Sequence, residues 1–398
     1  MPSTDEIATP APPVEEEARP LAAVDTPTPL PLPTPLEAYE RFEAVFEGVQ
    51  PPFAFLDLDA LWSNAADLLR RSRGKPIRIA SEAIRSRPVL ERLLDLDPGF
   101  QGALTHNLRE TLWLWEQGLR DLVVAYPSTD RACLTRLARI TSADPEEAPV
   151  VMADTVEHLD LIEESASPFV APVRVAIDVD LSWQPLRGLI KVGPRRSQVR
   201  TAEQAVALAQ EIERREHTRL VGVRAYEGQI AGIGDNVPGK GLTNLLVRGM
   251  QSASAKEVAE RRGEIVSALS DVAELEFVSG GGTGSIESSA AEWAVTEVAA
   301  GSGFYAPIAS DHHRAFQPRP AAMFAMPVTR ARADAAVPGA RRALPSGRPD
   351  RLEIGDTVYF RDLRAGELCE RTDRLFLVTG TTIRDEVPTY RGEGKSFR

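Results

Sequence analysis

The sequence has 398 residues, of which 43% are hydrophobic and 26% are charged, and its formal net charge is −12. A chain of this size and composition can bury a large core, either as two domains or as one barrel with an accessory piece. The acidic balance argues against nucleic acid and anionic membrane surfaces as partners, because both attract clustered lysine and arginine.

Two cysteines, Cys133 and Cys369, are too few for a disulfide framework. The acidic N-terminus does not resemble a secretion signal, and we find no apolar run of membrane-spanning length in the sequence. These features predict a cytoplasmic protein without a membrane span. The preference for arginine over lysine fits a GC-rich bacterial source.

Residues 1–36 are dominated by proline, alanine, threonine and glutamate, a composition that buries too little apolar surface to fold. We predict a disordered tail there, with a proline-motif docking site as the alternative. Residues 37–75, around "FAFLDLDAL", are predicted to form a lead-in strand and helix.

Residues 76–315 alternate short apolar segments with segments whose apolar residues recur at intervals of three and four. The first kind is typical of buried strands and the second of helices. The predicted strands are "PIRIAS", "GALTHN", "DLVVAYP", "VVMAD", "VRVAIDVD", "LVGVRAYEG", "LEFVSGGG" and "AVTEVAAG". Eight such units favour a closed (β/α)8 TIM-type barrel of parallel strands, with an open doubly wound sheet as the alternative.

Residues 316–398 instead alternate apolar and polar residues between turn signals, as in "DRLEIGDTVYF" and "ERTDRLFLVTGTTI". This pattern indicates antiparallel strands. We therefore predict a small C-terminal antiparallel β domain, completed by the N-terminal strand.

Two glycine-rich loops follow the last two predicted barrel strands. They are "SGGGTGS", residues 279–285, and "AAGSGFY", residues 299–305. Glycines let several backbone N–H groups converge on one point, which suits a phosphate, and barrels of this kind often bind phosphate after their seventh and eighth strands. The loops predict a phosphate site at the C-terminal end of the barrel, with plain tight turns as the alternative.

The order of the motifs "FAFLDLDAL", "RIAS", "IDVD", "RAYEGQIAG", "FVSGGGTGSIE", "GSGFYAP", "GELCERTD" and "PTYRGEG" carries a resemblance over roughly residues 50–398. It resembles the fold type III pyridoxal-phosphate enzymes, and within them the D-threonine aldolase-like, amino acid deaminase/aldolase branch. The resemblance implies an alanine-racemase-type barrel with a β domain, pyridoxal phosphate at the barrel mouth and a homodimer.

Carried over position by position, the resemblance places Tyr226 near the cofactor and makes Arg195 or Arg196 the partner of its ring or of the substrate. It assigns the phosphate to Gly281, Gly282, Thr283, Gly284, Gly301, Ser302 and Tyr305.

The resemblance also implies a divalent metal before the C-terminus. The matching positions hold Glu367 and Cys369, which mix a hard and a soft ligand. The alternative is that Glu367 is a turn carboxylate and Cys369 a small buried side chain.

The Schiff-base lysine of the resembling enzymes belongs at the end of the first barrel strand, where this chain has Glu82 in "RIASE". A carboxylate can act as a general base but cannot bond to the cofactor. His106, at the end of the next strand, is a second candidate base or a structural hydrogen-bonding residue. Lys191 and Lys240, in loops at the same end of the barrel, are the alternative amines.

The segment between "FAMPV" and "LEIGD" is also shorter than the resemblance implies. Together with Glu82, this predicts a catalytically impaired or repurposed homologue that binds phosphate or pyridoxal phosphate noncovalently, as a binding, regulatory or partner subunit. The alternative is an active lyase, deaminase or aldolase that acts on small D- or hydroxy-amino acids with Glu82 as the base.

Overall fold

The computed structural model describes residues 34–167, 169–185, 189–330 and 353–397. Almost all of the predicted N-terminal tail therefore lies outside the described residues. Helix α1 (Pro35–Val45) takes in the last two residues of the predicted tail. The reason is a capping box, in which the Thr34 hydroxyl accepts a hydrogen bond from Glu37 N and the Glu37 carboxylate accepts one from Thr34 N.

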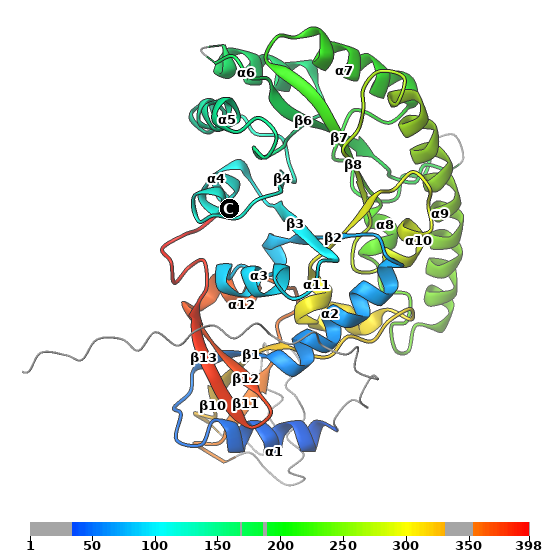
Figure 1. The fold of residues 1–398 in the computed structure, drawn as a ribbon. Helices are drawn as coiled ribbons and strands as arrows, with labels where there is room; N and C mark the ends of the chain where they lie inside the picture. The colour runs from blue at the N-terminus through cyan, green and yellow to red at the C-terminus, as the bar shows by residue number, and fades with distance from the viewer. Residues whose placement is uncertain (1–33, 168, 186–188, 331–352, 398) are drawn as a thin grey trace, which may run out of the picture. The chain divides into compact units, whose positions relative to one another are not determined.

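Eight parallel strands form the predicted barrel, and helices cover its outside (Figure 1). The strands are β2 (Ile77–Ala80), β3 (Phe100–Thr105), β4 (Leu122–Val124), β5 (Val151–Ala153), β6 (Val173–Asp180), β7 (Thr218–Tyr226), β8 (Phe277–Gly280) and β9 (Glu297–Ala300). Strand β2 pairs with both β3 and β9, and a parallel bridge between Val123 and Val150 joins β4 to β5. The sheet is thus closed, and the open-sheet alternative is wrong.

Polar side chains cap the N-termini of several barrel helices. The Asn107 side chain accepts a hydrogen bond from Glu110 N at 3.1 Å, and Thr201 accepts one from Gln204 N at 3.3 Å. The helices are α2 (Leu58–Ser72), α3 (Arg87–Leu94), α4 (Leu108–Glu116), α5 (Arg131–Ala143), α6 (Val156–Ala166), α7 (Ala202–Arg214), α8 (Gly228–Ala231), α9 (Gly241–Leu269), α10 (Ile286–Ala290) and α11 (Ser302–Tyr305). Because Asn107 caps α4 directly after β3, His106 stays at the end of that strand, at the barrel mouth.

A second sheet has the strand order β11-β10-β1-β12-β13. Its strands are β1 (Phe53–Asp57), β10 (Ala322–Pro327), β11 (Thr357–Phe360), β12 (Arg374–Thr379) and β13 (Thr382–Pro388), and α12 (Glu367–Arg371) lies between β11 and β12. The predicted completion by an N-terminal strand is confirmed, because β1 stands at the centre of the sheet. It runs antiparallel to β10 but parallel to β12, so one of the pairings departs from the predicted antiparallel pattern.

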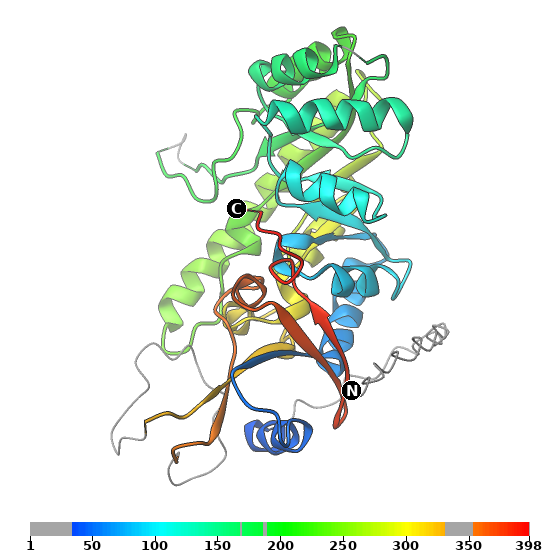
Figure 2. The same cartoon turned by 90° about the vertical axis from the view of Figure 1, so that its left-hand side faces the viewer.

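Helix α1 covers one face of this second sheet (Figure 2). Phe42 and Phe46 from the helix meet Phe55 of β1 with ring centroids 4.8 Å apart in each pair. Edge-on and tilted aromatic contacts of this kind add to the stabilisation that comes from burying the rings. In the part of the chain described, no helix is both long enough and apolar enough to cross a membrane.

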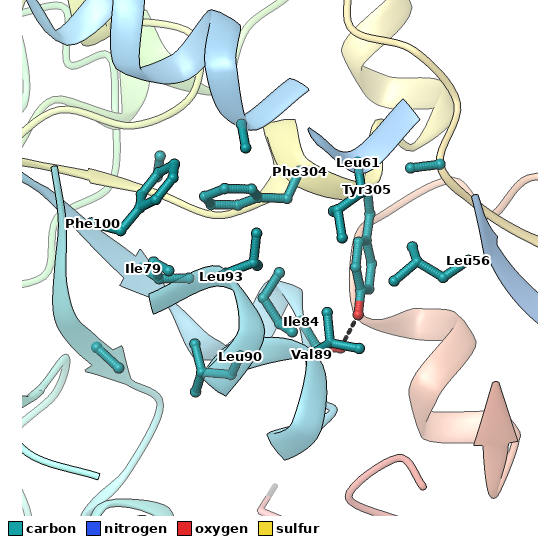
Figure 3. Close-up of a cluster of buried hydrophobic side chains, with 14 of the residues drawn as sticks. Leu56, Leu61, Ile79, Ile84, Val89, Leu90, Leu93, Phe100, Phe304 and Tyr305 are labelled. Carbon is teal, nitrogen blue, oxygen red and sulfur yellow. Dashed lines mark hydrogen bonds between the residues drawn. The ribbon is translucent and has the colours of Figure 1, made fainter. Parts of the chain in front are cut away.

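One hydrophobic cluster runs from the barrel into the second sheet, and Figure 3 shows its centre. Phe304 and Tyr305 of α11 point into it, beside Ile79 of β2 and Leu56 of β1. The core therefore fixes the second sheet against the barrel end that carries the glycine loops.

Candidate ligand pocket at the barrel mouth

A cavity of about 330 Å³ opens at the C-terminal ends of β2, β7, β8 and β9. Both glycine loops line it, as do Glu82 and the loop between β11 and α12. Its charged lining is otherwise basic and consists of Arg85, Arg196, Arg224 and Arg364. A cavity with convergent polar groups at this end of a barrel is where a ligand is expected.

The two glycine loops form one structure, which we call the glycine cradle: residues 279–283 and 299–302. The Thr283 hydroxyl joins them by accepting hydrogen bonds from Gly303 N at 3.0 Å and from Ser302 Oγ at 3.1 Å. Gly282 has no room for a side chain, because a Cβ there would lie 2.9 Å from the Tyr226 ring. Close packing thus requires glycine and leaves backbone atoms facing the cavity.

Five of the seven residues predicted to bind phosphate line the cavity: Gly281, Gly282, Thr283, Gly301 and Ser302. The structure places the other two elsewhere. A Cβ on Gly284 would lie 2.3 Å from the Ala231 carbonyl oxygen, so this glycine serves packing.

Tyr305 is only 2% exposed, and its hydroxyl donates to the Ile84 carbonyl oxygen at 3.0 Å inside the core (Figure 3). Its predicted phosphate contact is contradicted, because the short helix α11 turns the ring away from the cavity.

A buried ion pair supports the cradle from behind. Glu227 follows β7 and Arg262 lies on α9; both side chains are 1% exposed, and their nearest atoms are 2.6 Å apart. The Glu227 carboxylate also accepts hydrogen bonds from Ser285 Oγ at 2.6 Å, from Ser289 Oγ at 2.5 Å and from Gly281 N at 3.2 Å. A buried carboxylate with this many donors is well compensated, and it holds the loop after β8 in one position.

Neither Glu227 nor Arg262 is among the site residues predicted from the sequence. The signal was the alternation along β7. Because neighbouring residues of a strand point to opposite faces, Tyr226 facing the cavity puts Glu227 toward the helices.

One wall of the cavity combines arginine with tyrosine. The Arg196 guanidinium lies 5.2 Å from the centre of the Tyr126 ring and 5.1 Å from that of Tyr226. Arg224 lies 5.5 Å from the Tyr226 ring and pairs with buried Asp178 at 3.2 Å. Burial raises the pKa of the Tyr226 hydroxyl, so it stays protonated. Of the two arginines predicted as alternatives, Arg196 lines the cavity and Arg195 does not.

Glu82 lies on the opposite rim, in the short 3-10 helix η1 (Ser81–Ala83). Its Oε2 is 3.0 Å from Nδ1 of His106, and its side chain is 49% exposed. The hydrogen bond to His106 lowers the pKa of Glu82, and the same bond raises the pKa of His106. Two of the three predicted catalytic residues, Glu82 and His106, are therefore brought together as a hydrogen-bonded pair.

Glu110 holds this rim from below. Its carboxylate accepts hydrogen bonds from Ser81 Oγ and from His106 N, each at 2.7 Å. It thereby ties the residue before Glu82 to the backbone of His106. Gly366 closes over the rim, because a Cβ there would lie 2.2 Å from the Glu82 carbonyl oxygen.

Comparison with known proteins shows which solved structures this architecture resembles. No protein-family model matches the sequence. One curated relative, 3-hydroxy-D-aspartate aldolase from Paracoccus denitrificans, is 25% identical over 239 residues, which are 60% of this chain and 55% of the relative. The chain thus matches little more than half the length of that relative.

Among solved structures, D-threonine aldolase from Filomicrobium marinum superposes with a TM-score of 0.70 at 18% identity, covering 86% of this chain and 96% of that one. D-threo-3-hydroxyaspartate dehydratase from Delftia sp. HT23 gives 0.66 at 15% identity, covering 86% and 98%. Alanine racemase from Clostridium difficile 630 gives 0.57 at 13% identity, covering 85% and 99%. This chain has the fold type III architecture. The resemblance drawn from the motifs is confirmed.

No lysine lines the cavity of this fold type III chain within the described residues. Lys75 is at the start of β2, where its ammonium donates to the Val295 carbonyl oxygen at 2.5 Å. Lys191 and Lys240, the predicted alternative amines, are exposed on loops. At the position where the resembling enzymes have their Schiff-base lysine, this chain has Glu82.

The described residues give no support to the predicted metal site. Cys369 is 1% exposed, and burial raises the pKa of its thiol to about 12. No group of three or more His, Cys, Asp or Glu side chains in the described part of the chain is arranged to hold a metal ion. Glu367 begins helix α12, and Cys369 packs in the hydrophobic core.

Proposed function

We propose that this chain is a fold type III homologue that binds pyridoxal phosphate or a related phosphate ester without a covalent bond, and that it has lost lysine-dependent catalysis. The observation that carries this proposal is Glu82. It stands ionised on the cavity rim beside His106, and within the described residues no lysine lines the cavity.

The cradle side of the cavity fits a phosphate ester. Ser279 lines the cavity, is 2% exposed, and its hydroxyl has no hydrogen-bond partner within the described residues. A buried hydroxyl without a partner is costly, and a phosphate oxygen would supply the acceptor. Arg196 and Tyr226 offer a flat, cationic wall to an aromatic ring.

The rim side does not fit a covalently attached cofactor. Pyridoxal phosphate serves enzymes as an electron sink once a lysine amine has bonded to it. Glu82 can accept a proton or a hydrogen bond, but it has no amine with which to form that bond. We therefore assign binding and orientation to this chain's residues, and no lysine-dependent step.

A regulatory or partner subunit is the role that such binding suits. The proposal includes a cytoplasmic location and a homodimer, both of which rest on the sequence and on the resemblance. Light scattering after gel filtration tests the second: a mass of one chain would remove the dimer from the proposal.

Calorimetric titration tests the binding itself. Pyridoxal phosphate should bind at one site per chain, and unphosphorylated pyridoxal should bind at least about tenfold more weakly, because it lacks the charge-assisted hydrogen bonds of the cradle. Equal affinity for the two compounds, or no binding of either, would contradict the proposal.

An active lyase or deaminase on small hydroxy-amino acids is the second candidate, and the half-exposed carboxylate of Glu82 favours it. The lowered pKa of Glu82 makes that carboxylate a weak base, which argues for the first candidate. Release of ammonia, glycine or an aldehyde from D-threonine or D-serine, abolished by Glu82→Ala, would establish the second candidate in place of the first.

A further inference from the structure

We infer that the ligand of this cavity is a phosphate ester whose opposite end carries a cationic amine, with pyridoxamine phosphate as the representative compound. The inference rests on the proposed function, because it takes the glycine cradle as the phosphate site. It adds the identity of the group that faces Glu82.

The first argument is hydrogen-bonding capacity at the rim. Oε2 of Glu82 is engaged by His106 at 3.0 Å, whereas no described residue donates a hydrogen bond to Oε1. An ionised carboxylate only accepts hydrogen bonds, so the ligand group beside it must be a donor. An aldehyde oxygen is an acceptor too, and two acceptors facing each other repel. An ammonium group has three donors and a positive charge.

The second argument is the distribution of charge around the cavity. Arg224 is neutralised by Asp178 at 3.2 Å, and Arg85 forms an ion pair with Glu370 outside the cavity lining. Arg196 and Arg364 have no ion-pair partner within the described residues.

The cavity thus offers positive charge for a phosphate and one carboxylate, Glu82, whose Oε2 is hydrogen-bonded to His106 and whose Oε1 accepts no hydrogen bond from a described residue. A ligand with an anionic and a cationic end complements both, and an aldehyde-bearing ester complements only the first.

The third argument is the support of the rim backbone that carries the Glu82 carboxylate. Glu110 fixes Ser81 and the His106 backbone, and Gly366 packs against the Glu82 carbonyl oxygen. A carboxylate on a supported rim gives up little freedom when it binds an ammonium, which favours a specific contact.

The test compares three phosphate esters that differ in one group: pyridoxamine phosphate with an amine, pyridoxine phosphate with a hydroxyl of similar size, and pyridoxal phosphate with an aldehyde. Dissociation constants are measured calorimetrically on the full chain. We expect pyridoxamine phosphate to bind at least about tenfold more tightly than pyridoxine phosphate, the ratio typical of one charge-assisted hydrogen bond.

Glu82→Gln keeps the size of the side chain and removes its charge. The tenfold preference for the amine should fall to about onefold, while the affinity for pyridoxine phosphate stays the same. Glu91→Gln is the matched control, because Glu91 lies on neighbouring helix α3, pairs with Arg87 and does not line the cavity. It should leave the preference unchanged, and thermal unfolding of both variants checks that they are folded.

Equal affinities for the three esters in the unmodified chain would overturn the inference and leave the proposed function standing. A preference that survives Glu82→Gln would also overturn it, because the amine would then contact another group. Absence of binding by all three esters would overturn both the inference and the proposed function.

Discussion

The glycine cradle and the Glu82 rim face the same cavity, but different contacts hold them in place. In the cradle, Gly282 and Gly301 are packed too closely for a side chain, and the buried Glu227–Arg262 pair supports the loop from behind. The rim presents half-exposed side chains, Glu82 and His106, on a short 3-10 helix and a strand end. A phosphate site of the proposed kind depends on many packed atoms, whereas lysine chemistry depends on one side chain. Lysine chemistry can therefore be lost while the phosphate site remains.

The largest expected effect comes from breaking the support of the cradle. Glu227→Ala removes one of the two carboxylates that pair with buried Arg262, the other being Glu292, and it leaves the hydroxyls of Ser285 and Ser289 without their acceptor. Breaking a buried pair in this way typically costs about 3–5 kcal/mol of unfolding free energy. Urea unfolding measures this loss.

Glu276→Ala is the control for that change. Glu276 also forms arginine ion pairs, with Arg174 and Arg219, but its side chain is 38% exposed. Exposed pairs contribute less than about 1 kcal/mol. If Glu227→Ala lost no more stability than Glu276→Ala, the buried Glu227–Arg262 pair would not be what holds the cradle in place.

A smaller effect on stability but a strong one on binding is expected for Gly282→Ala. The added Cβ would lie 2.8 Å from Ala231 Cβ and 2.9 Å from the Tyr226 ring, so the cradle must shift. We expect pyridoxal phosphate to bind at least about tenfold more weakly in calorimetry, because displaced N–H groups lose their charge-assisted hydrogen bonds.

Gly249→Ala is the matched control for this glycine, because it lies exposed in helix α9 with nothing within 4 Å of an added Cβ. Replacing a helical glycine by alanine stabilises by up to about 1 kcal/mol and should leave binding unchanged. Undiminished binding by Gly282→Ala would show that the cradle does not hold the phosphate.

The smallest expected effect is on the pKa of His106 at the rim. Glu82 raises the pKa of His106, so Glu82→Gln should bring that pKa back toward 6.5. NMR titration of the imidazole resonances measures the change, and His313, whose pKa burial lowers, should titrate alike in both proteins. An unchanged His106 titration would mean that the pair does not form in solution.

The contact between Glu82 and His106 also makes the stability of the protein depend on pH. A histidine whose pKa is raised by folding contributes stability below its unfolded pKa and loses it as the pH rises through the folded value. The unfolding free energy of the wild-type chain should therefore fall as the pH rises from the unfolded to the folded pKa of His106. The Glu82→Gln chain should lack this decrease. The same pH dependence of the unfolding free energy in both proteins would contradict the contact between Glu82 and His106.

Much of the barrel could be predicted from the sequence because its signals are local. Apolar runs and helical periodicity depend on neighbouring residues, and each predicted strand overlaps an observed one. The glycine loops were predicted for the same reason, since their composition alone requires unusual backbone. Their position at one barrel mouth then followed from the topology.

Other parts of the site depend on contacts between distant segments. Arg262 lies 35 residues beyond Glu227, on a helix face that the sequence does not mark as polar or catalytic. Arg364 reaches the cavity only because the second sheet packs on the barrel. Tyr305 and Cys369 were placed at the site from their neighbours in sequence, whereas α11 and α12 turn them into the core.

Mass spectrometry after borohydride treatment tests the central claim most directly. The wild-type chain and Glu82→Lys are each incubated with pyridoxal phosphate, reduced, and mapped by peptide. We predict no stoichiometric adduct at any single site of the wild-type chain and one adduct at residue 82 of the variant, because only the variant places an amine on the rim. A stoichiometric adduct on one of the wild-type chain's own lysines would contradict noncovalent binding.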